Sequence, residues 1–332
     1  MGVLLVGLLG VAALIPIGKV AISETNKSDR TGMCGRAGIR DVKTRRMLDA
    51  TAWSSTPTGN TFVLDPLGYA KGLSGTNFGG TASSMQRISL NNVVAEDVFR
   101  WQDELTFDSS TNPTSRPRPV VRDSKGNVGP YPSLPSENPQ LVAPVTQQSD
   151  GHFTWLLTVT ASPGEVQAGL TWAQRRQFLV SVTVCWNRLF SNNSTDTTAN
   201  PADLGEATVS VVCDNATGYG GVGIQYDASK STVMPKENEW VLLTSTNNNG
   251  QASWYRVVSA GTDTVGPPPD PAIKTTRATL VGCDWHGGVG GTAATATAAV
   301  SPDDTVKLIV VKGATGVYTT TVQLDDDGIW TK

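Results

Sequence analysis

The sequence has few of the residues from which catalytic and metal sites are usually built. It contains only two histidines, His152 and His286, which lie more than a hundred residues apart. None of the four cysteines belongs to a CxxC pair, which argues against a zinc cluster or a thioredoxin-type motif. A GxSxG motif is missing, and the glycine-rich segment at 75–80 lacks the residue placement of a phosphate-binding loop. We therefore expect a protein that is not an enzyme and has no cofactor.

Charge is also scarce, and it is unevenly distributed. Charged residues make up 17% of the chain, hydrophobic residues make up 39%, and glycine occurs 34 times. This composition is typical of a loop-rich, exported β protein rather than of a helical cytosolic enzyme. The first 50 residues carry eight basic and four acidic side chains, a balance of +4, so with a total of −3 the rest carries −7. A basic N-terminal part and an acidic remainder can attract each other between copies.

The first 18 residues, MGVLLVGLLGVAALIPIG, carry no charge and are apolar apart from their glycines and Pro16. A helix of this length spans roughly 27 Å, close to the thickness of a bilayer core. A cleavable signal peptide is disfavoured, because no Lys or Arg precedes the apolar run.

A charged segment follows and continues the helical pattern. Its apolar residues approximate helical spacing: Val20, Met33, Ala37, Val42 and Met47. We predict one stem helix over 1–53, hydrophobic over 1–18 and amphipathic over 19–53, roughly 75 Å long. Pro16 removes the hydrogen bond to the carbonyl of Ala12, so we expect the helix to be interrupted there when stems assemble.

These N-terminal features carry a family resemblance. The string GLLGVAALIPIGK, its charged continuation to about Trp53 and the β-rich remainder resemble a type IV pilin or pseudopilin, the prepilin-type subunits. The segments FTWLLTVTA, FLVSVTVCWNR, SWYRVVSAG and GVYTTTVQLD resemble the large prepilin-type proteins of planctomycete-like bacteria. In contrast to the family pattern, this sequence shows neither a short basic leader ending in glycine nor a glutamate in the first turn of the stem.

The resemblance implies a structural subunit of an extracellular type IV pilus-like filament. Before assembly the hydrophobic stem would be anchored in the inner membrane, and afterwards it would lie in the filament core. The core side chains would be Leu4, Leu5, Leu8, Leu9, Val11, Leu14, Ile15 and Pro16. The implied partners are other copies of the chain, in a helical homopolymer, and the pilus or secretion assembly machinery. We expect no binding of nucleic acid.

Two alternative functions stay open. One is a minor pilin or type II secretion pseudopilin, which would prime or cap a filament instead of forming its bulk. The other is a membrane-tethered secreted binding module or enzyme, which would need a convergent polar pocket that the sequence does not reveal.

From residue 153 onward the apolar pattern changes to period two. In FTWLLTVT the apolar residues from Phe153 to Val159 share one face and the threonines share the other, which predicts a half-buried strand. Further strands are expected over 178–186, 207–211, 239–246, 251–260, 277–285, 305–312 and 316–324. Because consecutive strands without helices imply an antiparallel sheet, we predict an α+β fold, with the C-terminal half of the stem helix packed on a β-rich head, 54–332.

Two parts of the head depart from this pattern. Eight prolines between Asp108 and Asp150 predict an extended connection over 108–150. Helical spacing of apolar residues predicts a second helix over 93–105, whose default role is core packing.

The cysteines are candidates for disulfides. Cys34, Cys185, Cys213 and Cys283 are an even number in a chain that we expect to be exported, so two disulfides are predicted. Three pairings are possible, and the sequence does not choose among them.

Clustered acidic residues are the best calcium candidate. Asp325, Asp326 and Asp327 precede a turn glycine, Gly328, and carboxylates suit a hard cation. They lack the alternating spacing of an EF-hand loop, so a solvated acidic turn is the simpler interpretation.

Overall fold

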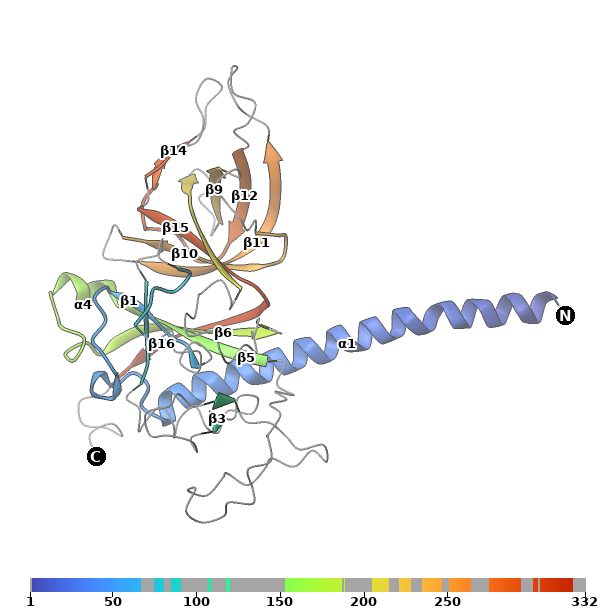
Figure 1. The fold of residues 1–332 in the computed structure, drawn as a ribbon, viewed down its shortest axis with the longest axis horizontal. Coiled ribbons are helices and arrows are strands. Elements are labelled where there is room, and N and C mark those ends of the chain that lie inside the picture. Colours follow the sequence, from blue (N-terminus) through green and yellow to red (C-terminus); the bar gives the residue numbers. More distant parts are fainter. Residues whose placement is uncertain are drawn as a thin grey trace, which may run out of the picture.

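The computed structural model describes the backbone of residues 2–66, 75–80, 85–90, 107–108, 118–119, 153–186, 188, 205–214, 221–227, 235–246, 251–263, 275–293, 301–303 and 305–324. The side chains of α1 are described from Gly18 onward. Helix α1 (Gly2–Thr44) packs through its C-terminal half on a body of β-sheets and extends away from it at its other end (Figure 1). The predicted α+β fold is thereby confirmed.

Helix α1 ends at Thr44, earlier than the end near Trp53 that the sequence predicts. Arg46 adopts a left-handed φ of 55°, and the amide of Met47 donates to the carbonyl of Val42 at 3.2 Å, the six-to-one bond of a Schellman motif. Met47 is then fully buried, so the chain turns out of the helix into the core. A short 3₁₀ turn, η1 (Ala50–Ala52), follows.

The sheet that carries α1, here called the stem sheet, has five strands in the order β16–β6–β5–β1–β2. Their bounds are β1 Thr61–Leu64, β2 Gln86–Ile88, β5 Phe153–Ala161, β6 Gln177–Trp186 and β16 Ala314–Gln323. A short helix, α4 (Pro163–Gln167), lies between β5 and β6 in the sequence. The pair β1–β2 is parallel, so the purely antiparallel sheet expected from the sequence is wrong for this edge.

Strand β5 is buried on both faces, although its alternating pattern predicted a half-buried strand. Trp155 and Leu157 belong to the apolar core on the α1 side, and Leu156 belongs to a second core on the opposite side. The threonine face is covered as well, and Thr158 accepts a hydrogen bond from Nε1 of Trp254 at 3.0 Å. A threonine hydroxyl that has a hydrogen-bond partner can lie in a protein interior. The polar face of β5 was therefore wrongly predicted to be exposed to solvent.

The second sheet curls into a barrel. Its order is β7–β15–β10–β11–β12–β9–β8, with antiparallel pairing throughout. The bounds are β7 Glu206–Ser210, β8 Val212–Asp214, β9 Gly221–Asp227, β10 Trp240–Ser245, β11 Ala252–Asp263, β12 Thr275–Val281 and β15 Val306–Val311. Because β7 and β8 are separated only by Val211, one chain segment pairs with β15 and β9 and closes the sheet on itself.

The barrel has its own interior and packs externally on the stem sheet. Inward-facing side chains such as Tyr255, Ile224 and Leu308 fill the interior. Outward-facing residues of the barrel, among them Leu242 and Ile309, pack against the stem sheet. In Figure 1 the three layers follow one another as α1, stem sheet and barrel.

Two short strand pairs complete the described elements. Strand β3 (Phe107–Asp108) pairs with β4 (Arg118–Pro119), and β13 (Gly291–Thr292) pairs with β14 (Ser301–Pro302). The predicted helix over 93–105 and most of the predicted connection over 108–150 lie outside the described residues.

Candidate functional site

Helix α1 leaves the body near Thr31. Every side chain from Gly18 to Arg30 is exposed except that of Lys27, which is half-buried. From Thr31 onward, buried residues recur at helical spacing: Thr31, Gly35, Gly38 and Val42. The helix is therefore divided into a part that projects and a part that is docked on the stem sheet (Figure 1).

Glycines allow the docked part of α1 to approach the sheet closely. A Cβ atom at Gly35 would lie 2.1 Å from Cδ2 of Tyr318 on β16, and one at Gly38 would lie 2.9 Å from Cγ1 of Val182 on β6. The hydroxyls of Thr31 and Thr315 are 3.1 Å apart. The sequence analysis did not single out these glycines, whereas in the structure they shape the contact.

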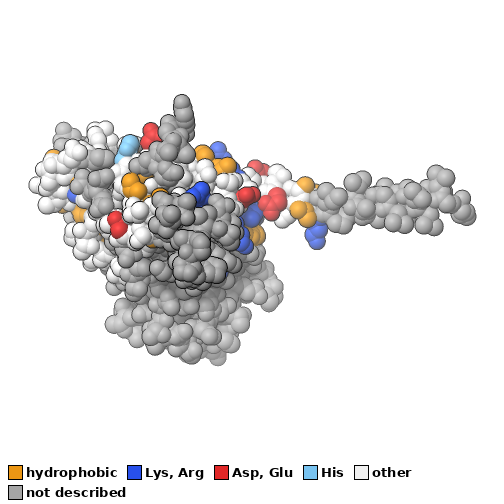
Figure 2. Space-filling view, turned by 90° about the horizontal axis from the view of Figure 1, so that it is seen from above, with side chains coloured by type: hydrophobic (Ala, Val, Ile, Leu, Met, Phe, Trp, Pro, Cys, Tyr) orange, Lys and Arg blue, Asp and Glu red, His pale blue; other side chains and the backbone are white. Residues whose placement is uncertain are grey.

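The projecting part of α1 is a mixed surface. Val20 and Ile22 are 63% and 64% exposed, which is high for large apolar side chains. Figure 2 shows apolar, basic and acidic side chains together where the helix leaves the body. Such a surface offers both apolar area and charge to a neighbouring molecule.

The predicted filament-core residues can be placed only on the backbone. Leu4, Leu5, Leu8, Leu9, Val11, Leu14, Ile15 and Pro16 all belong to α1, while their side chains lie outside the described part. Helix α1 is continuous through Pro16 in this single chain. Within the residues whose side chains are described, which for α1 begin at Gly18, no helix is long and apolar enough to cross a membrane. Interruption of the helix in an assembly stays a prediction.

The outward face of docked α1 is basic. Arg36, Arg40 and Lys43 are exposed and follow one another at helical spacing. Arg45, directly after the end of α1, forms an ion pair with Asp41 at 3.8 Å. The prediction that the basic residues of the stem, these and Arg46, meet acidic groups of another copy concerns an assembly and stays a prediction.

The predicted disulfides are not formed. None of the four cysteines is bonded to another. Cys185 is buried between the stem sheet and the barrel, Cys213 is buried inside the barrel, and Cys283 is exposed beyond β12. Burial raises the pKa of the Cys185 and Cys213 thiols to about 12, which keeps both protonated. Cys185 and Cys213 instead serve as apolar core residues, in two different cores.

The described residues hold no metal cluster. Within the ranges given above, no three His, Cys, Asp or Glu side chains are grouped so that they could bind an ion. His286 is exposed. The calcium candidate Asp325, Asp326 and Asp327, together with His152, lies outside the described residues.

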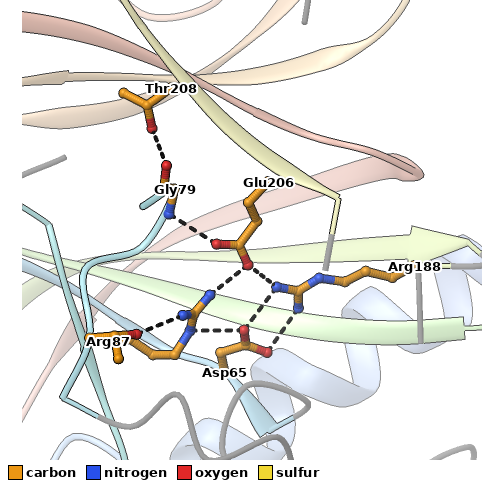
Figure 3. A network of polar contacts seen from close by, with 7 residues as sticks. Asp65, Gly79, Arg87, Arg188, Glu206 and Thr208 are labelled. Carbon is orange, nitrogen blue, oxygen red and sulfur yellow. Dashed lines mark hydrogen bonds and ion pairs between the residues drawn. The ribbon is translucent and has the colours of Figure 1, made fainter. Parts of the chain in front are cut away.

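A buried cluster of four charged side chains, here called the charge quartet, lies between the stem sheet and the barrel (Figure 3). It consists of Asp65, Arg87, Arg188 and Glu206, each at most 4% exposed. Arg188 donates two hydrogen bonds to Asp65, both at 2.8 Å, and one to Oε1 of Glu206. Arg87 contacts Asp65 at 3.1 Å and Glu206 at 2.5 Å. Each guanidinium therefore bridges both carboxylates.

The carboxylates of the charge quartet favour the charged form of Arg188. Burial alone would lower the pKa of Arg188, but the carboxylates of Asp65 and Glu206 raise it above its ordinary value. Sequence analysis missed this cluster because its members are far apart in the chain. The sequence shows only that Asp65 follows one apolar strand directly and that Arg188 follows another by two residues, which is also the pattern of an ordinary strand end.

No protein-family model, curated protein or solved structure shows a significant match to this chain.

Proposed function

We propose that this chain is a structural subunit of an extracellular, type IV pilus-like filament and that its copies polymerise through the apolar N-terminal part of α1. The observation that carries the proposal is the length of α1 relative to what the body uses. The helix has 43 residues, roughly 65 Å at 1.5 Å per residue, and only the part from Thr31 is docked. The body thus leaves roughly 40 Å of helix to project.

The chemistry of the projecting part fits assembly with copies of itself. The first 18 residues are uncharged, and fully burying a Val or Leu side chain contributes about 1.5–3 kcal/mol relative to exposure in water. Several such residues per copy would make a dry helical core cohesive. Membrane lipid shelters the same residues nearly as well, so transfer from an inner-membrane anchor into a filament needs an assembly machine.

An enzymatic role is not part of this proposal. The charge quartet is fully buried and balanced, with two positive and two negative groups, so it supplies no accessible reactive side chain. Two exposed features of the described part, the projecting part of α1 and the basic outward face of its docked part, suit assembly better than catalysis.

The test is to place a charge in the proposed filament core. Leu9→Arg would bury an arginine among neighbouring stems, where desolvation without a partner is costly. We expect this variant to be made at normal levels and to form no filaments, as judged by electron microscopy of sheared surface material. Normal filaments from Leu9→Arg would overturn the packing hypothesis.

A matched control adds the same charge on the head. Val258, on β11, is an apolar residue that is 54% exposed. Val258→Arg should leave filament formation unchanged, because an arginine there stays in water. The abundance of the chain in sheared filaments separates a bulk subunit from a minor pilin or pseudopilin.

A further inference from the structure

The barrel and the stem sheet meet through an interface that is largely apolar. Leu156 and Val63 of the stem sheet pack on Leu242, Trp254 and Ile309 of the barrel. Apolar burial stabilises such a contact but is non-directional, so it favours contact without selecting one relative orientation. The hydrogen bond from Nε1 of Trp254 to Thr158 also crosses this contact, but it joins two neutral groups. A stronger directional element is needed to explain a single arrangement.

We propose that the charge quartet is this element and that it fixes the barrel in one orientation on the stem sheet. Three members belong to the stem-sheet side: Asp65 follows β1, Arg87 lies on β2, and Arg188 follows β6. Glu206 lies on β7 of the barrel. Both arginines reach across the interface to Oε1 of Glu206, so the barrel carboxylate sits between two guanidinium groups.

Burial makes the quartet intolerant of a shift in the interface. The side chains of all four residues are at most 1% exposed. If the barrel turned, Glu206 would lose both arginines while remaining out of water, and an unpaired buried charge is far more costly than a displaced apolar contact. The geometry therefore disfavours every orientation but one.

A second contact beside the quartet also depends on this orientation. The loop at 75–80 is held to β2, because the amide of Gly75 donates to the carbonyl of Arg87 at 2.8 Å. Within this loop the amide of Gly79 donates to Oε2 of Glu206 at 2.9 Å, and Thr208 donates to the carbonyl of Gly79 at 2.7 Å (Figure 3). Both of these partners lie on β7.

Gly79 is suited to this contact. It has a φ of 82°, and a Cβ atom there would lie 2.4 Å from Oγ1 of Thr208 and 2.9 Å from Cγ2 of Ile309. A side chain would push the loop away from the barrel and break the two hydrogen bonds to β7.

The experiment measures the spread of barrel positions relative to α1. One spin label is placed on native Cys283 of the barrel and a second on Arg40→Cys of α1, with Cys34→Ala to prevent unwanted labelling. The full chain in detergent should give one narrow distance distribution in double electron–electron resonance. In the variant Asp65→Leu/Arg87→Met/Arg188→Met/Glu206→Leu we expect a distribution at least about twofold broader, because apolar repacking retains folding before it retains uniqueness.

Two further variants show whether a broader distribution results from loss of the charge quartet itself. Arg87→Lys keeps the charge balance but lacks the fork that reaches both carboxylates, so it should broaden the distribution to an intermediate width. The matched control is Asp41→Leu/Arg45→Met, which removes the partly exposed ion pair at the C-terminal end of α1 and should leave the width unchanged. Folded quartet variants with the narrow wild-type distribution would overturn the proposal.

The chain with its natural quartet provides a test that does not depend on variant folding. If the quartet makes the barrel and the stem sheet one unit, the distance distribution should stay narrow up to a single urea transition. Broadening of the distribution well before loss of β-structure would show that the quartet does not fix the orientation.

Discussion

At the scale of single residues, the docked part of α1 relies on side chains that are small. Gly35 lies under the ring of Tyr318 and Gly38 lies against Val182, so the helix backbone itself is the contact surface. Glycine normally weakens a helix by about 1 kcal/mol relative to alanine. Here this cost is offset by the close packing of the helix backbone on Tyr318 and Val182, which larger residues at these positions would prevent.

Substitution of Gly35 tests this balance. Gly35→Ala gains helix propensity but places a methyl group 2.1 Å from the Tyr318 ring, so we expect a net loss of about 1–3 kcal/mol in the free energy of unfolding. Gly18→Ala is the matched control, since no described side chain lies within 4 Å of its Cβ position, and it should be neutral or slightly stabilising. Urea unfolding of both variants measures the difference. Equal stabilities would mean that Tyr318 moves aside freely.

The buried thiols predict how stability depends on pH. The thiols of Cys185 and Cys213 have an ordinary pKa of 9.0 when the chain is unfolded and a pKa of about 12 when it is folded. Below pH 9 both thiols are protonated in the folded and the unfolded chain, so their full contribution to stability is present. Between pH 9 and 12 the thiols lose their protons only in the unfolded chain, so the free energy of unfolding falls as the pH rises. The slope should approach about 1.4 kcal/mol per pH unit for each thiol.

Urea unfolding under reducing conditions, at pH values on both sides of 9, measures this slope. In the variant Cys185→Val/Cys213→Val the free energy of unfolding should change little with pH just above pH 9. The variant Cys283→Ser, changed at an exposed site, should largely retain the dependence on pH. Burial also raises the pKa values of Tyr226 and Tyr255, whose contribution adds at still higher pH. A slope unaffected by the double variant would contradict burial of these thiols.

At the scale of elements, the end of α1 is set by backbone geometry without the usual glycine. Arg46 occupies the left-handed position with a φ of 55°. We expect Arg46→Gly to be more stable than Arg46→Ala by about 1 kcal/mol, because glycine adopts this conformation without steric cost. Comparing the two variants cancels the loss of the arginine side chain. Thermal unfolding is the measurement, and equal midpoints would mean that the turn relaxes.

Periodicity predicted the longer strands of this fold, but it missed β1, β2, β8 and β9 and did not show how the strands form layers. The strands β5, β6, β10, β11 and β16 appear close to their predicted positions because alternation is a local property. The end of α1 was misplaced because no glycine marks Arg46. The barrel was missed because its closure depends on pairing β7 with β15 and β8 with β9, which no local pattern encodes.

The candidate sites differ in the same way. The apolar N-terminal run is contiguous, so the sequence could suggest an assembly surface. The charge quartet joins Asp65 to Arg188 and Glu206 across more than a hundred residues, and such a pairing depends on the tertiary fold. Single charged residues beside apolar strands look like ordinary strand ends.

At the scale of the whole molecule, the packing of α1 places the boundary between stem and head near Thr31 and not after Trp53. The sequence predicted a boundary after Trp53, yet four residues before or at this position belong to the core of the stem sheet: Val42, Met47, Leu48 and Trp53. Nε1 of Trp53 also donates to the carbonyl of Met47 at 2.9 Å. The docked half of α1 is therefore a layer of the head, and only the part before Thr31 projects from it.

Truncation tests this division. A chain that begins at Lys19 retains every contact described between α1 and the body, so it should unfold cooperatively with the stability of the full chain. A chain that begins at Ser54 lacks the four core residues, and truncating even one large core side chain typically costs about 2–5 kcal/mol. Because total stability is commonly about 5–15 kcal/mol, we expect the shorter chain not to fold cooperatively.

Calorimetry and size-exclusion chromatography distinguish the two chains, and a peptide spanning 19–53 provides the control. Added in trans, this peptide supplies the missing helix and core residues, so it should restore a cooperative transition to the chain that begins at Ser54. The same peptide carrying Gly35→Trp should not, because the larger side chain cannot fit beneath Tyr318. If the chain from Ser54 folded cooperatively alone, the docked half of α1 would be an attachment to a complete head and not one of its layers.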